Sequence, residues 1–482
     1  MRPAIRTGAA AVLLAGPVAL AFRSGGYFAE PRLAAGIAAW LLAAIGFAIG
    51  GGPLPRTAPG RLAVAGLAAL TALVGLSILW APIAGLAQSD LQRLLLYLGA
   101  MLAGVCLLRG RTGLRTVEPA LAAGILVVVG YALSARLLPG LIEQDASRSA
   151  AGRLEQPLTY WNAVGALAAI GFVLAVRVAG DRTRKRWLAA CAAAAAVPLA
   201  VGVYQSFSRG ALLALLLGVV VIVVAGPDRA QLRVIGSTAA AAVAACLAAG
   251  LLPAVRALEG TAGAREGQGA VMLLVLATTM AVSALAAARL RTGAPEGAFR
   301  VPWVAAAAAG VVIVGGFLVV ASGAGSKNGQ PRYGADTRRL ASFESNRYEY
   351  WKVAGRMFAG APLAGEGSGA FRVVWRRERP IDDPALDAHS LPVETAAELG
   401  LLGLLAFGAM VGGVAWSTAR LLGRRRTEAV GAAASLSAFV LHSAVDWDWE
   451  MPTLALVAVL LAAAVVAALD EAQEAGTAPS GS

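Results

Sequence analysis

The chain has 482 residues, of which 58% are hydrophobic and only 14% are charged. Soluble domains usually carry about 25% charged residues, so this composition argues against a soluble enzyme. Apolar stretches of about 20 residues, the length that crosses a bilayer as a helix, recur along the whole chain. The period-two alternation of membrane strands is not sustained anywhere. The sequence therefore predicts an all-α polytopic membrane protein.

The formal net charge of +13 does not indicate a nucleic-acid partner. Much of the arginine lies in short connections between apolar stretches, where it sets the orientation of a membrane protein. The three cysteines, Cys106, Cys191 and Cys246, fall inside apolar stretches and indicate neither a disulfide framework nor a metal cluster.

About 12–14 membrane-spanning helices are expected from the apolar stretches. The first stretch resembles a cleavable signal peptide, but a retained first helix is the preferred interpretation. In chain order, the predicted spans lie near 8–22, 33–50, 62–80, 92–108, 118–138, 160–178, 187–204, 210–226, 234–252, 268–289, 301–321, 396–418, 428–444 and 452–470.

The arginine and lysine of the short connections lie mostly on one side of this layout, which predicts that both termini are cytoplasmic in an inner membrane. We expect a transmembrane bundle of about 11 helices over 1–321, a large extracytoplasmic loop over 322–395, C-terminal transmembrane helices over 396–470, and a disordered tail over 471–482. Four outward connections follow, at 137–159, 204–209, 322–395 and 442–452. A loop as long as 322–395 is usually functional.

The long loop carries the first group of candidate residues. Arg347 and Trp351 stand four residues apart and share one face of a predicted helix. Gly365–Gly369 is interpreted as a flexible turn in preference to a phosphate-binding loop. His389 either is an ordinary loop histidine or acts as a general base, since a neutral imidazole accepts a proton. Glu398 follows at the entry to the next span.

Two further outward segments carry polar candidates. Arg209 precedes a predicted helix, so its guanidinium and the helix N-terminus could together bind an anion, although an arginine at the interface often only reaches for water. Arg153 and Asn162 could contact a polar ligand, whereas Tyr160 and Trp161 between them fit an aromatic belt.

The last outward turn contains His442 and the pair Asp446 and Asp448. The Asp-x-Asp spacing is similar to the metal-binding pair of soluble glycosyltransferases. Those enzymes use cytoplasmic nucleotide sugars, however, and this turn is predicted to lie outside. A hydrogen-bonded loop is therefore the preferred interpretation, with metal binding as the alternative.

Together these segments resemble the O-antigen ligase and polymerase superfamily of membrane glycan transferases. The resemblance extends over most of 75–450, and its motifs are short but occur in a fixed order. It rests on Ser208-Arg209-Gly210, Arg347-x-x-x-Trp351, Pro362-Leu363-x-Gly365-x-Gly367, Ala388-His389-Ser390, Glu398-x-Gly400-Leu401-x-Gly403 and the stretch 153–165.

The resemblance implies a GT-C-like bundle and a donor glycan carried on undecaprenyl diphosphate, with a glycan, lipid or protein acceptor and no nucleotide, metal or other cofactor. It implies that Arg209 and Arg347 are essential arginines and that His389 is the essential loop histidine. We expect a metal-independent, inverting displacement at the outer face, with Arg153, Asn162, Trp351 and Glu398 binding substrate. Ligase and polymerase activity are not separated by the sequence.

Two features depart from the family pattern. Ser390 stands where asparagine usually follows the histidine, and about two more spans are predicted than the usual number. The main alternative function is a transporter or flippase of lipid-linked glycans. Transporters usually carry charge near the middle of the membrane, and the predicted spans have almost none.

Overall fold

The computed structural model describes residues 2–50, 54–109, 111–145, 147–292, 315, 334–336, 340, 345–424 and 427–477. Every regular element among these residues is helical, and 11 helices are long and apolar enough to cross a membrane. The chain is therefore an all-α, multi-pass membrane protein, as predicted. Each predicted span coincides with one helix, except that the span near 301–321 lies outside the described residues apart from residue 315.

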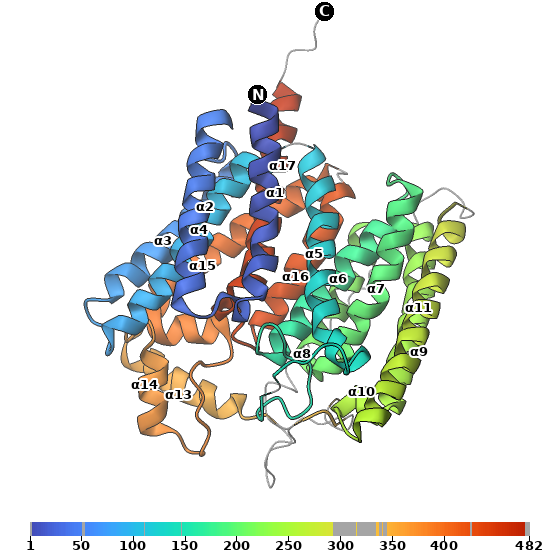
Figure 1. Cartoon of the computed structure of the whole chain (residues 1–482). Helices are drawn as coiled ribbons and strands as arrows, with labels where there is room; N and C mark the ends of the chain where they lie inside the picture. Colours follow the sequence, from blue (N-terminus) through green and yellow to red (C-terminus); the bar gives the residue numbers. More distant parts are fainter. Residues whose placement is uncertain are drawn as a thin grey trace, which may run out of the picture.

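The helices follow one another as a bundle whose N-terminal part runs from α1 to α11 (Figure 1). Their bounds are α1 Arg2–Ala21, α2 Ala29–Gly50, α3 Ala58–Ser77, α4 Ala84–Leu107, α5 Arg111–Leu137, α6 Trp161–Gly180, α7 Arg186–Ser206, α8 Arg209–Ala225, α9 Arg229–Leu251, α10 Pro253–Ala257 and α11 Ala262–Thr292. A short 3-10 turn, η1 (Ser24–Gly26), joins α1 to α2.

The C-terminal part comprises α13 Arg347–Gly360, α14 Ala370–Glu378, α15 Leu391–Gly423, α16 Val430–Ser443 and α17 Pro452–Thr477, with 3-10 turns η3 Thr427–Ala429 and η4 Asp448–Glu450. α17 continues to Thr477, so residues 471–477 are helical and do not belong to the disordered tail that we expected. Glu471, Gln473 and Glu474 are good helix formers, and Arg56 pairs with Glu474. Residues 478–482 lie outside the described part.

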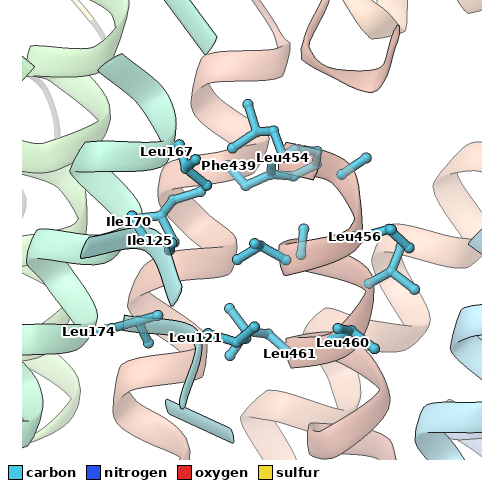
Figure 2. Packing of buried hydrophobic residues seen from close by; sticks show 14 of the residues in the cluster. Leu121, Ile125, Leu167, Ile170, Leu174, Phe439, Leu454, Leu456, Leu460 and Leu461 are labelled. Atoms are coloured by element: carbon cyan, nitrogen blue, oxygen red, sulfur yellow. The ribbon is translucent and has the colours of Figure 1, made fainter. Parts of the chain in front are cut away.

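Helices α6 and α17 form the centre of the bundle, because 100% of the apolar window of α6 and 94% of that of α17 are buried. Leucines of α17 pack against α5 and α6 from one side, and Phe439 of α16 lies beside them (Figure 2). The labelled residues of this core are Leu121, Ile125, Leu167, Ile170, Leu174, Phe439, Leu454, Leu456, Leu460 and Leu461.

Helices α13 and α14 lie at one end of the bundle, opposite the end at which α1 begins and α17 ends (Figure 1). They have a small core of their own, in which Trp375 is fully buried and stacks edge-on against Tyr350 with ring centroids 4.9 Å apart. The indole N–H of Trp375 donates to the carbonyl of Asp383 at 2.7 Å. This part of the long loop is thus a packed unit resting on the bundle.

Candidate active site

Asp446, in the turn between α16 and α17, receives hydrogen bonds from three side chains in two segments that are far apart in sequence. Its carboxylate accepts from the Tyr160 hydroxyl at 2.6 Å, from Asn162 Nδ2 at 2.7 Å and from Arg347 Nη2 at 2.9 Å. The Asp446 side chain is 2% exposed. Because buried charges require such partners, Asp446 fixes the start of α6 and the start of α13 relative to each other.

The charge state of Asp446 follows from the groups around it. Burial by itself raises the pKa of this carboxyl, but the Arg347 guanidinium, His389 and His442 reverse the effect and hold the pKa below its ordinary value. Asp446 is therefore ionised at neutral pH. The Arg347 side chain is 17% exposed, and its guanidinium is bound to Asp446 through Nη2.

His389 occupies a constrained position just before α15. Its φ of 54° lies in the left-handed region, which is costly for a residue other than glycine. His389 Nδ1 lies 3.0 Å from the carbonyl oxygen of Asp387, and its ring centroid lies 5.2 Å from that of Tyr350. Trp351 Nε1 donates to the carbonyl of Ala388 at 3.1 Å. Helix α13 therefore holds the backbone beside this histidine.

The glycines after α13 form a rigid junction with α15. Gly400 has φ 62° and ψ −155°, which breaks α15 after its first turns. A Cβ added at Gly400 would lie 2.5 Å from backbone atoms of Leu363, and one at Gly365 would lie 2.2 Å from the backbone of Glu398. Two backbone hydrogen bonds, from Leu401 to Pro362 and from Leu402 to Leu363, close the junction. Gly365 is thus part of a packed turn, whereas we expected a flexible one.

Glu398 lies at this junction and serves the loop. Its carboxylate accepts from the backbone N–H of Gly369 at 2.8 Å and of Phe371 at 2.9 Å, at the N-terminus of α14. Glu398 also lines a cavity of about 200 Å³ between α4 and the loop. Within the described residues, the three carboxylates that could hold a metal ion are Asp387, Glu394 and Glu450 of that cavity, with oxygens within 4.8 Å of one another.

Arg209 is the first residue of α8, one position before the start that the sequence predicts. The Ser208 side chain caps this helix by accepting from the N–H of Ala211 at 3.3 Å. The next residue, Gly210, packs against the His442 ring, since a Cβ added there would lie 3.1 Å from His442 Nε2. His442 pairs through Nδ1 with Asp448. The N-terminus of α8 is therefore joined to the same turn that contains Asp446.

Asp446 and Asp448 have different partners, and the turn is held by hydrogen bonds, in agreement with the preferred interpretation of this segment.

Arg153 lies apart from Asp446. Its guanidinium stacks on the Trp161 ring at 3.5 Å and donates to the carbonyls of Ala150 and Ser149 at 2.7 and 2.6 Å. Arg153 lines a separate polar cavity of about 290 Å³ together with Arg136 and Arg265.

The roles of Asp446 and Tyr160 in the site were not predicted. Asp446 was considered only with His442 and Asp448, and Tyr160 only as an interfacial aromatic residue. The sequence did contain a signal for Asp446. Asp446 and Arg347 both lie in segments predicted to face outward, and charged residues at a membrane face usually require partners. The pairing with Arg347 was not predictable, since the two residues are 99 positions apart.

The arrangement joins a partly exposed arginine, a helix N-terminus and an imidazole at one end of the bundle. Such a combination suits an anionic group beside a proton acceptor. Residues 264–408 match a family model described as O-antigen ligase, and this match supports membership of the chain in the O-antigen ligase superfamily. The matched segment includes Arg347, Trp351, His389 and Glu398, and it excludes Arg153, Asn162 and Arg209. A comparison with curated proteins found no match.

Proposed function

We infer from membership in the O-antigen ligase superfamily that the chain transfers a glycan, and we propose that the donor is linked to undecaprenyl diphosphate. The acceptor is a hydroxyl of a glycan, a lipid or a protein. The reaction takes place at the extracytoplasmic face of the inner membrane, at the end of the bundle where α13 and α14 lie. It proceeds by one inverting displacement without a metal ion.

In the proposed reaction, the acceptor oxygen attacks the anomeric carbon of the donor while His389 takes the hydroxyl proton. The new bond joins the anomeric carbon to the acceptor oxygen, and the bond from that carbon to the diphosphate oxygen breaks. Undecaprenyl diphosphate leaves with the electron pair. Arg209 and Arg347 stabilise the negative charge that develops on it, because guanidinium groups fit phosphate oxygens.

The observation that carries this proposal is the buried Arg347–Asp446 pair with Asn162 at the same carboxylate. It joins the loop helix that begins with Arg347 to the outer end of α6, and Gly210 joins the start of α8 to the same turn through His442. Residues that the sequence put in four separate segments are thus held at one end of the bundle. The hydrogen bond from Trp351 to the carbonyl of Ala388 holds the backbone beside His389 at the same end of the bundle.

The proposal is tested by transfer with purified protein in lipid, an undecaprenyl-diphosphate-linked oligosaccharide and a set of acceptors, with and without EDTA. The expected result is transfer that EDTA does not affect and that is lost in His389→Ala. Binding of the donor without transfer by any form of the protein, together with movement of the donor across the membrane, would instead support a flippase.

A further inference from the structure

The polar cavity that Glu398 lines is also lined by Asp387, two residues before His389. It has a volume of about 200 Å³ and is bordered by the start of α2, the start of α4, the N-terminus of α14 and the turn η4. Five carboxylates line it, and we call it the acidic cavity: Asp90, Asp387, Glu394, Glu398 and Glu450.

We propose that the acidic cavity binds the sugar of the acceptor and selects a sugar that is neutral or bears an amino group over one that bears phosphate. This inference rests on the proposed function. The volume is room for roughly seven water molecules at about 30 Å³ each, which suits one sugar ring and is large for a single ion. The Tyr27 and Phe28 side chains line the cavity and offer apolar ring faces.

The cavity also has arginines, and these argue for a sugar. Arg32 and Arg93 are 4% and 5% exposed, and the Nε–H of each has no hydrogen-bond partner within the described part of the chain. Arg372 also lines the cavity. Sugar hydroxyls both donate and accept, so they can pair with carboxylates and with guanidinium groups together. A metal ion satisfies only the carboxylates and is repelled by the guanidinium groups.

The pairing of the arginines disfavours binding of the donor diphosphate in this cavity. Five carboxylates face three guanidinium groups, and Arg93 is already shared between Asp90, at 3.1 Å, and Glu450. Arg32 donates to the Tyr27 carbonyl at 2.8 Å and to Gln92 Oε1 at 3.2 Å, so an added phosphate would find both of these guanidinium groups already bonded. The diphosphate is accommodated at Arg209 and Arg347, and a non-anionic group is accommodated in the acidic cavity.

His389 interacts with residues of both sites, the acidic cavity and the site around Asp446. Its Nδ1 contacts the carbonyl of Asp387, whose side chain lines the cavity, and Glu394 Oε2 accepts from the N–H of Ala388 at 2.7 Å. On the other side, His389 is close enough to Asp446 to affect its ionisation. An acceptor hydroxyl presented from the cavity therefore lies beside the residue that takes its proton.

The test compares acceptor sugars that share one ring and differ in charge: methyl glucoside, its 2-amino analogue and its 6-phosphate. Their binding to the full-length protein in lipid nanodiscs is measured by calorimetry without donor, so the result does not depend on transfer. We expect the two non-anionic sugars to bind at least tenfold more tightly than the phosphate. Glu394→Gln should weaken their binding at least tenfold, and Glu378→Gln, which changes an exposed carboxylate of the same loop, should leave it unchanged.

In the transfer assay, Glu394→Gln should raise the acceptor KM at least tenfold with little change in the donor KM, provided that its melting temperature matches that of the parent. Asp90→Asn provides the same readout if Glu394→Gln unfolds. Transfer by the parent with equal preference for the three acceptors, or binding of Ca²⁺ or Mg²⁺ but of no sugar, would overturn the inference and leave the proposed function standing. Absence of transfer with every acceptor, combined with selective sugar binding, would count against the proposed function alone.

Discussion

Arg347 and Asp446 form an ion pair of 2.9 Å between the first residue of the loop helix α13 and the buried turn before α17. The carboxylate is 2% exposed and is shared with Tyr160 and Asn162. Breaking a buried pair by removing one partner costs about 3–5 kcal/mol. This ion pair is therefore a strong restraint on where the loop helix lies relative to the membrane bundle.

Asp446→Asn should lower kcat at least tenfold while the donor KM stays constant or falls. The amide keeps a hydrogen-bond acceptor but loses the charge that orients Arg347, and the more positive site attracts an anionic donor more strongly. Steady-state kinetics with the lipid-linked donor provide both constants. Asp382→Asn is the matched control, since that side chain is 94% exposed. A rise in donor KM with unchanged kcat would contradict the role given to Asp446.

Gly400→Ala should destabilise the protein by about 2 kcal/mol or more, because the left-handed backbone and the contact with Leu363 both exclude a Cβ. Gly408→Ala in the same helix is the control, since a Cβ there meets nothing within 4 Å. Thermal unfolding in detergent measures the difference. Equal melting temperatures for the two variants would show that the junction is not rigid.

The preference against anionic acceptors should grow as the pH rises. Burial raises the pKa of Asp387 and of Glu450 above their ordinary values, against the opposing effects of His389, Arg372 and Arg93. Raising the pH through that range therefore adds negative charge to the acidic cavity. The stability contributed by the protonated forms is lost over the same range, since their pKa values are higher in the folded state. The ratio of kcat/KM for methyl glucoside to that for its 6-phosphate, measured from pH 5 to 8, should increase. A ratio that falls with pH would be inconsistent with an acidic subsite.

The proposed orientation predicts which positions a membrane-impermeant maleimide reaches in intact cells. In a background without Cys106, Cys191 and Cys246, Arg356→Cys on α13 should be labelled from outside, because its side chain is 56% exposed. Lys185→Cys, in the connection between α6 and α7, should react only after permeabilisation. The opposite pattern would place α13 and α14 in the cytoplasm.

The spans were predictable from sequence because hydrocarbon imposes a minimum apolar length, and each expected span outside 301–321 coincides with a helix. Two of these helices, α8 with 17 residues and α16 with 14, are not among the 11 described helices that are long and apolar enough to cross a membrane. The start of α15 at Leu391 was placed too late, since its first turns contain Glu394 and Glu398 and read as loop. Trp351 and Arg347 were identified correctly as neighbours on one helical face of α13.

The contacts between segments were not predictable. The partner of Asp446 depends on how α13 folds back on the turn before α17, and no local pattern encodes that distance. Arg153, like Arg347, is an arginine in a segment predicted to face outward, yet its guanidinium stacks on Trp161 and binds backbone carbonyls. Glu398 was expected at substrate, and its hydrogen bonds to the N-terminus of α14 add an anchoring role.

The most direct test of the central claim is the initial rate of glycan transfer from an undecaprenyl-diphosphate-linked donor by the parent, Arg209→Ala, Arg347→Ala and Arg356→Ala. Each charge-assisted hydrogen bond to the leaving diphosphate contributes roughly 1.5–3 kcal/mol, so the first two variants should lose about tenfold to a hundredfold or more in rate. Arg356→Ala, an exposed arginine on the same helix as Arg347, should match the parent. Full activity in Arg209→Ala and Arg347→Ala would contradict the account, because the developing negative charge would then be stabilised elsewhere.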